Sequence, residues 1–363
     1  MKQRKIYKKK VKQHLHTHKK TYKKLKAYTN ISKNTHILTN TLIQTKKSKS
    51  LCAPFIEPTS LSKGNYLSKS NINIIKSATD ESCFSIEALR KIANKWNAGN
   101  TETTNNPNMK IQFDNNTSGS ALWSSINNVM KYKCNNEICW MKQDFIKDSP
   151  LAKELLKNFK PLMPKKWLSN PIEWLNTIDI RDVMNQYEIK YPHFEFIGPV
   201  PMDFDTKVGF GQCVIDELCK INLNDLMKKG KSKIGVVFNL DKHTQSGSHW
   251  VAMYGDFKGE KGVTGENGIG QICYWDSYGM KPNKEVVVLM ERLKKQAAEI
   301  GHNVNININT VRHQYKNSEC GVYCIYFLTS LLDGEKSFKN IVKNIVKDDD
   351  MNAKRVEYFN KSD

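Results

Sequence analysis

The sequence has no apolar run long enough to cross a membrane, and no apolar segment of a secretory signal peptide follows its lysine-rich start. Hydrophobic residues make up 39% of the 363 positions and aromatic residues 10%. This composition excludes a wholly disordered chain as well as one dominated by membrane spans. We therefore predict a soluble globular protein with no membrane partner, large enough for a main domain and an accessory region.

Acidic residues are missing from the first 50 positions, which carry 16 Lys and Arg. The rest of the chain is close to balanced, so most of the net charge of +21 comes from this segment. Such a segment repels itself and lacks a regular apolar face, which predicts an extended, solvated arm. Two interpretations stay open: the arm provides solubility alone, or it contacts nucleic acid or another polyanion.

A regular cysteine framework is also missing. The nine cysteines are odd in number, and their spacing predicts free thiols in a reducing compartment. Cys134 and Cys139 have no second Cys or His pair at metal-ligand spacing. The sequence therefore predicts neither a metal site nor a cofactor.

Composition and periodicity divide the chain into four parts. Residues 1–78 are predicted to be the basic, disordered arm and a linker rich in Ser, Thr, Asn and Lys. Residues 79–165 are predicted to form a helical accessory domain, residues 166–345 the main domain, and residues 346–363 a C-terminal tail. Pro161 and Pro164 mark the boundary before the main domain.

The apolar pattern changes period in the second half of the chain, which predicts an α+β core. The final helix is apolar almost all round and is therefore expected to be buried. The expected strands are 234–240, 250–257, 271–276 and 304–311, with an extended segment at 193–197. The expected helices are 82–96, 122–132, 151–159, 176–187, 213–227, 283–300 and 319–332.

Cys320 has the best local setting for a nucleophile. A thiol attacks a carbonyl as the thiolate, and the positive end of a helix dipole stabilises that form. Cys320 falls in the first turn of the last predicted helix, and Gly321 is expected to leave the backbone open to substrate. Taken alone, a buried structural cysteine is the stronger interpretation.

Two further residues strengthen the case for a thiol nucleophile. His249 lies at the junction of a small-residue loop and a strand, and Asp276 lies at an end of the neighbouring predicted strand. A carboxylate there would fix the tautomer of the imidazole and stabilise its charged form. Gln314, six positions before Cys320, is predicted to help form an oxyanion hole together with a backbone N–H.

The ordered set SHW, then WDS, then Gln-x5-Cys-Gly at the start of an apolar helix resembles the adenain and SUMO-specific protease clan of cysteine peptidases. The lysine- and asparagine-rich composition and the segments CFSIEALRKIANKWN and WLNTIDIRDVMNQYE are similar to those of virion-maturation proteases of large nucleocytoplasmic DNA viruses. The resemblance implies a central mixed sheet packed between helices, with the nucleophile at the N-terminus of a buried helix.

The resemblance also implies cleavage after Gly-Gly or Gly-Xaa, with Trp250 helping to form a channel that admits only glycine. A core tryptophan is the competing interpretation. The Gly-rich insertion between His249 and Asp276 departs from the family pattern and is expected to be a surface hairpin loop.

The expected function is a thiol endopeptidase that processes viral capsid or core precursors, in the virion and in the host cytoplasm at the viral factory. One alternative is an enzyme that removes ubiquitin or SUMO from conjugates. An alternative of another class is a nucleic-acid-binding structural protein with a degenerate protease fold.

Overall fold

The computed structural model describes residues 50–61, 81–99, 109–259 and 268–361, all within one compact unit, Ser48–Asp363. The predicted basic arm over residues 1–49 and the middle of the long insertion, residues 260–267, lie outside the described residues. No helix of the described part is long and apolar enough to span a membrane.

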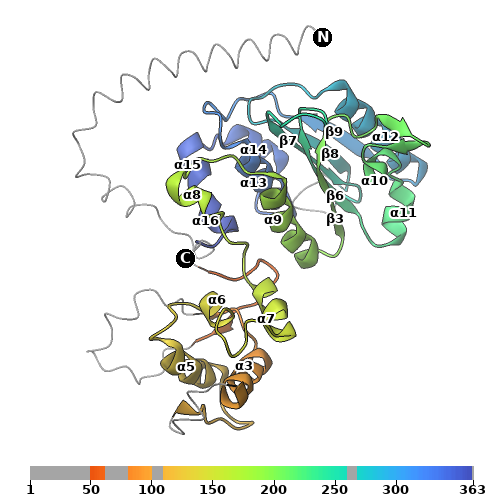
Figure 1. Cartoon of the computed structure of the whole chain (residues 1–363). Coiled ribbons are helices and arrows are strands. Elements are labelled where there is room, and N and C mark those ends of the chain that lie inside the picture. Colours follow the sequence, from red (N-terminus) through yellow and green to blue (C-terminus); the bar gives the residue numbers. More distant parts are fainter. Residues whose placement is uncertain (1–49, 62–80, 100–108, 260–267, 362–363) are drawn as a thin grey trace, which may run out of the picture. The chain divides into compact units, whose positions relative to one another are not determined.

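A five-stranded mixed sheet forms the centre of the main domain (Figure 1). Its order is β3–β6–β7–β8–β9, in which the outer pairs are parallel and the two inner pairs antiparallel. This confirms the predicted α+β fold with a mixed sheet. The strands are β3 (Phe194–Pro201), β6 (Lys233–Asn239), β7 (Trp250–Asp256), β8 (Gly270–Trp275) and β9 (Val304–Ile308).

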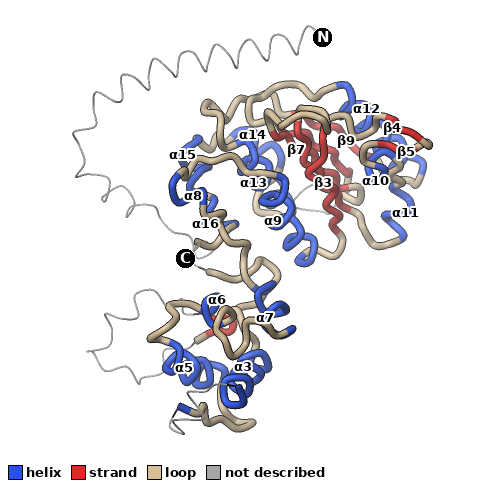
Figure 2. The backbone as a smooth tube through the Cα atoms, in the orientation of Figure 1, coloured by secondary structure: helices blue, strands red, loops and turns tan. Residues whose placement is uncertain are grey.

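Helices cover both faces of this sheet (Figure 2). On one face lie α9 (Thr177–Lys190) and α13 (Cys320–Leu332), and on the other lies α12 (Lys284–Glu299). Strand β7 serves both layers because its side chains alternate: Ala252 faces α13, and Val251 faces α12. Helix α13 is buried along its whole length, as its apolar composition predicts.

The predicted helix 213–227 is wrong as a single element. In its place are a small hairpin and two short helices, because Asn222 starts a new helix by accepting a hydrogen bond from the Asp225 N–H. Leu218 and Leu223 still pack into the α12 layer, which explains the apolar spacing in the sequence. The elements are β4 (Lys207–Gly209), β5 (Gln212–Cys213), α10 (Asp216–Cys219) and α11 (Leu223–Lys228).

The segment predicted as a C-terminal tail belongs to the core of the main domain. Helices α14 (Phe338–Lys343), α15 (Asp348–Ala353) and α16 (Arg355–Tyr358) follow α13. Met351, Tyr358 and Phe359 are buried in the same cluster as α13. The main domain therefore extends past the predicted boundary at residue 345. The charged residues 347–350 gave no sign in the sequence that the segment after them is buried.

The guanidinium of Arg355 is buried in this C-terminal segment. It stacks on Trp167 at 4.4 Å from the ring centre and donates a hydrogen bond to the Glu173 carbonyl at 2.5 Å. The last helix is thereby joined to the first segment of the main domain, which includes α8 (Lys166–Ser169).

A separate apolar cluster holds the predicted helical region together. Residues 50–61, which composition assigns to the linker, belong to this cluster through the buried Cys52 and the partly buried Leu51 and Ile56. Its elements are β1 (Thr59–Ser60), β2 (Glu81–Ser82), α3 (Ile86–Gly99), α5 (Gly119–Met130), α6 (Glu137–Trp140), α7 (Pro150–Leu155) and η4 (Leu156–Asn158).

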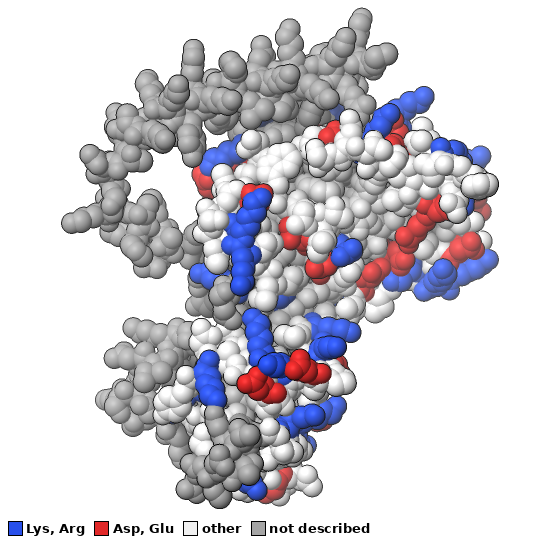
Figure 3. Space-filling model, viewed as in Figure 1, with Lys and Arg blue, Asp and Glu red and all other residues white. Residues whose placement is uncertain are grey.

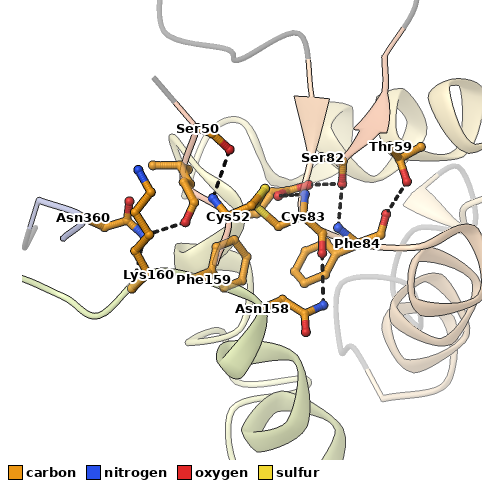
Figure 4. Close-up of a disulfide and its surroundings, with 12 residues drawn as sticks. Ser50, Cys52, Thr59, Ser82, Cys83, Phe84, Asn158, Phe159, Lys160 and Asn360 are labelled. Carbon is orange, nitrogen blue, oxygen red and sulfur yellow. Dashed lines mark hydrogen bonds between the residues drawn. A yellow bond between two sulfur atoms is a disulfide. The ribbon is translucent and has the colours of Figure 1, made fainter. Parts of the chain in front are cut away.

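The prediction that the cysteines are free thiols is wrong for six of the nine. Disulfides join Cys52 to Cys83, Cys134 to Cys139 and Cys213 to Cys219. Figure 4 shows the first of these beside the rings of Phe84 and Phe159. Sequence spacing could not reveal these pairs because the fold decides which cysteines meet. Cys273, Cys320 and Cys324 are free and buried.

Candidate active site

His249 and Asp276 meet at one edge of the sheet. His249 immediately precedes β7, and Asp276 immediately follows β8. Because these strands are antiparallel neighbours, the start of one lies beside the end of the other. The ring Nε2 of His249 lies 2.8 Å from Oδ1 of Asp276, and both side chains are buried. This contact leaves Nδ1 as the ring nitrogen available to another group.

Cys320 is that other group. It is the first residue of α13, and its sulfur lies within hydrogen-bonding reach of His249. Burial alone would lower the pKa of His249, but the Asp276 carboxylate and the Cys320 sulfur outweigh it and raise that pKa to about 10. The imidazole is therefore protonated at neutral pH, which places a positive charge and the N-terminus of a helix beside the sulfur.

Gln314 lies in the loop before α13, and its side chain is fully buried. Its Oε1 accepts a hydrogen bond from the Ser277 hydroxyl at 2.6 Å, and its backbone N–H donates to the Ser277 carbonyl at 2.8 Å. Its Nε2 has no hydrogen-bond partner among the described residues. A buried donor without a partner can donate a hydrogen bond to an oxygen of water or of a ligand.

The comparisons with known proteins identify the family of this chain. The Ulp1 protease family, in its C-terminal catalytic domain, matches residues 224–363. A thiol protease of Acanthamoeba polyphaga mimivirus is 31% identical over 296 residues, which span 77% of this chain and 89% of that protein. The chain belongs to the Ulp1 family of cysteine proteases. Its predicted resemblance to SUMO-specific and viral proteases is confirmed.

Two further comparisons concern African swine fever virus. Its SUMO-1 cysteine protease is 27% identical over 239 residues, or 62% of this chain and 83% of that protein. The crystal structure of the virus protease matches with a TM-score of 0.52 and 23% identity, over 70% of this chain and 95% of that chain. That likeness shows that the chain shares the fold of the virus protease.

Trp250 packs against the start of α13 in this Ulp1-family protease. It is 6% exposed, and its indole Nε1 donates to the Leu175 carbonyl at 2.9 Å. A Cβ placed on Gly321 would lie 3.4 Å from the Trp250 ring and 2.9 Å from the Leu175 Cβ. The expectation that Gly321 opens the backbone to substrate is therefore wrong, because this glycine is buried and allows close packing.

Several supporting residues were not predicted from the sequence. Asn309 donates from its side chain to the Asp276 carbonyl at 2.8 Å, and Tyr278 stacks on the His249 ring at 4.7 Å. Asp348 accepts the backbone N–H groups of Tyr315 and Lys316 at 2.9 Å each. Of all the supporting residues, Ser277 alone had a sequence signal, since it follows Asp276 in the WDS motif.

His313 is the other histidine near the nucleophile, and the structure places it in the core. Its Nε2 lies 3.2 Å from the Val342 carbonyl, and its ring meets Trp275 edge to face. Burial lowers its pKa, so it stays neutral at neutral pH. Among the described residues, no group of His, Cys, Asp and Glu side chains is arranged to hold a metal ion.

Proposed function

We propose that this Ulp1-family protease is a thiol endopeptidase with Cys320 as nucleophile, His249 as general base and acid, and Asp276 as the group that orients His249. Gln314 supplies an oxyanion-hole donor. The observation that carries the proposal is the buried pair of His249 and Asp276, with Cys320 in reach of His249 at the first position of α13. The buried Gln314 Nε2, which has no partner among the described residues, supports the role of Gln314.

The reaction follows from these positions. The Cys320 thiolate attacks the peptide carbonyl, and the resulting oxyanion accepts hydrogen bonds from Gln314 and from the backbone N–H of Cys320. The His249 imidazolium gives its proton to the leaving amine, which departs with the C-terminal part of the substrate. A water molecule, deprotonated by His249, then attacks the thioester, which releases the acid product and restores the Cys320 thiolate beside the His249 imidazolium.

Glycine specificity is supported by the packing around Cys320. The Trp250 indole, held by the Leu175 carbonyl, lies against Gly321 next to the nucleophile. An indole this close to the nucleophile would narrow the path of the substrate, and a narrow path rejects side chains larger than hydrogen. We therefore assign cleavage after Gly-Gly or Gly-Xaa.

The proposed substrates are viral structural polyproteins, cleaved in the virion and in the cytoplasmic viral factory. Two relatives are viral proteases, which supports a viral substrate. The second candidate function is removal of a ubiquitin-like protein, because the protease of African swine fever virus is named for SUMO-1. An electrophilic SUMO or ubiquitin probe separates the two: labelling of Cys320 favours deconjugation, and cleavage of Gly-Gly-Xaa precursors alone favours maturation.

Nucleic-acid binding would depend on the first 49 residues. On the face shown in Figure 3, basic and acidic side chains of the described residues are interspersed. A DNA-binding measurement on the full chain and on a variant without residues 1–49, repeated over a salt series, tests this role. If the DNA affinity of the full chain falls steeply with salt, and the variant lacks this dependence, the arm binds nucleic acid. If the salt dependence is the same in both proteins or absent from both, the arm has no such role.

The test of the proposed protease is cleavage of a peptide panel by the wild type, Cys320→Ala and Cys324→Ala. Cys324 is the control because it lies one helical turn after Cys320 in α13 and is likewise buried and free. We expect Cys320→Ala to abolish cleavage and Cys324→Ala to retain it, with Gly-Gly-Xaa peptides preferred over Ala-Ala-Xaa. Full activity of a folded Cys320→Ala protein would refute the assignment of the nucleophile.

A further inference from the structure

Arg312 is held between two aromatic rings beside the proposed active site. Its guanidinium carbon lies 4.6 Å from the ring centre of Tyr315 and 5.4 Å from that of Tyr278. Its Nε donates to the backbone carbonyl of Gln314 at 2.8 Å. A planar guanidinium stacked in this way loses little freedom when its remaining N–H groups bind a partner.

The charge of Arg312 is not paired within the part of the chain that the structure describes. Its contacts there are the two rings and the Gln314 carbonyl. Lys316, four residues later in the same loop, forms an ion pair with Asp349. The loop therefore carries one cation with a carboxylate partner and one that is pre-oriented and lacks such a partner among the described residues.

The position of Arg312 relative to the reacting atoms follows from the stacking. Tyr278 stacks on the His249 ring at 4.7 Å, so two ring contacts, of 4.7 and 5.4 Å, connect the imidazole to the guanidinium. An extended peptide advances roughly 3.3 to 3.6 Å per residue, so Arg312 reaches a substrate residue within about three positions of the cleaved bond.

The same contacts also indicate on which side of the cleaved bond Arg312 would meet the substrate. The proposed glycine site belongs to the acyl part of the substrate and lies near Trp250, which packs with Leu175 on Gly321 beside Cys320. His249 must reach the leaving amine to protonate it, so the leaving segment starts beside the imidazole, on which Tyr278 stacks. Arg312 contacts the ring of Tyr278 in turn.

We propose that Arg312 binds an acidic side chain in the leaving segment of the substrate, within about three residues after the cleaved bond. A carboxylate matches the two-pronged geometry of the guanidinium. This inference rests on the proposed function and refines it, because it adds a requirement for charge on the C-terminal side of the glycine site.

The experiment compares three Gly-Gly-Xaa peptides that differ only in the second and third residues after the cleaved bond, which are glutamate, glutamine or lysine. For the wild type we expect a kcat/KM about tenfold higher with glutamate than with lysine, because an attractive contact replaces a repulsive one. Arg312→Glu should reverse the order, and raising the salt concentration should shrink the difference.

Lys316→Glu is the matched control, since it reverses a charge in the same loop that already has a partner. It should keep the preference of the wild type for glutamate. The readout is the ratio of the kcat/KM values of one enzyme for two peptides. A general loss of activity from a disturbed Gln314 would lower both values alike and leave this ratio unchanged. An unchanged preference in Arg312→Glu, or the same reversal in Lys316→Glu, overturns the inference.

The two proposals fail in different ways. If the wild type cleaves Gly-Gly-Xaa peptides at equal rates whatever the charge that follows, the role of Arg312 is refuted and the glycine-specific protease stands. If it does not prefer glycine, or if Cys320→Ala cleaves as well as the wild type, the proposed function itself is refuted.

Discussion

At the scale of single residues, Ser277 joins the two halves of the proposed active site. It directly follows Asp276 in the chain, and its hydroxyl and carbonyl both bond to Gln314. Because the Ser277 hydroxyl donates to the amide oxygen of Gln314, the amide nitrogen is the atom that can donate to the substrate. Ser277 is a positioning residue in this account, since it acts through Gln314.

We expect Ser277→Ala to lower kcat by about 10- to 100-fold with little change in KM, because the loss of a buried hydrogen bond costs about 1 to 3 kcal/mol and affects the oxyanion donor only in the transition state. Steady-state kinetics measures this effect. In a Gln314→Ala background the same substitution should have almost no further effect, and additive losses in the double variant would contradict the positioning role.

The pKa of His249 makes a second prediction, about stability. The folded protein raises this pKa from 6.5 to about 10, so the stabilisation by the protonated ring is complete below pH 6.5 and is lost as the pH rises to 10. Asp276 is a main cause of the rise. The difference in free energy of unfolding between the wild type and Asp276→Asn should therefore shrink between pH 6.5 and pH 10.

Chemical denaturation at a series of pH values measures this difference. A difference that stays constant over that range would show that the Asp276 carboxylate does not favour the charged imidazole.

At the scale of elements, the start of α13 depends on a glycine. In a helix, Gly→Ala usually stabilises by about 0.5 to 1 kcal/mol. At Gly321 the sign should reverse, because the new Cβ would lie 2.9 Å from the Leu175 Cβ. We expect Gly321→Ala to destabilise the protein by about 1 to 3 kcal/mol, as measured by denaturant unfolding. If Gly321→Ala instead stabilised the protein, the contact with Leu175 would be relieved by a small shift at no cost in stability.

The loop before α13 depends in turn on the N-terminus of α15. Asp348 accepts two backbone N–H groups of that loop, whereas its neighbour Asp349 makes an exposed ion pair. We expect Asp348→Ala to lower kcat/KM by about tenfold or more through loosening of Gln314, since each lost buried hydrogen bond costs about 1 to 3 kcal/mol. Asp349→Ala should have little effect, and equal effects of the two substitutions on peptide cleavage would contradict this anchoring role.

At the scale of the whole molecule, the periodic parts of the sequence predicted the structure well. The strands of the sheet and the buried helix α13 lie within a few residues of their expected bounds, because continuous apolar runs and helical spacing are local signals. His249, Asp276, Gln314 and Cys320 were predicted from order and spacing, and the structure brings the first two to 2.8 Å and places Cys320 beside them.

What the sequence did not predict depends on contacts between distant segments. Asp348 lies 33 residues from the loop that it holds, and Arg355 lies 182 residues from the Glu173 carbonyl that it binds. The disulfide between Cys52 and Cys83 likewise depends on the packing of two separate segments. In the sequence, charged residues such as Asp348 and Arg355 suggest a solvated tail. In the structure, both bind backbone groups of distant segments.

The central claim is that one cysteine of nine forms the acyl intermediate. Its most direct test is mass spectrometry after the enzyme is mixed with a Gly-Gly peptide that carries a C-terminal electrophile, followed by mapping of the modified residue. The account predicts a single adduct on Cys320, with labelling much slower in His249→Ala. An adduct on Cys273 or Cys324, or equal labelling in His249→Ala, would contradict it.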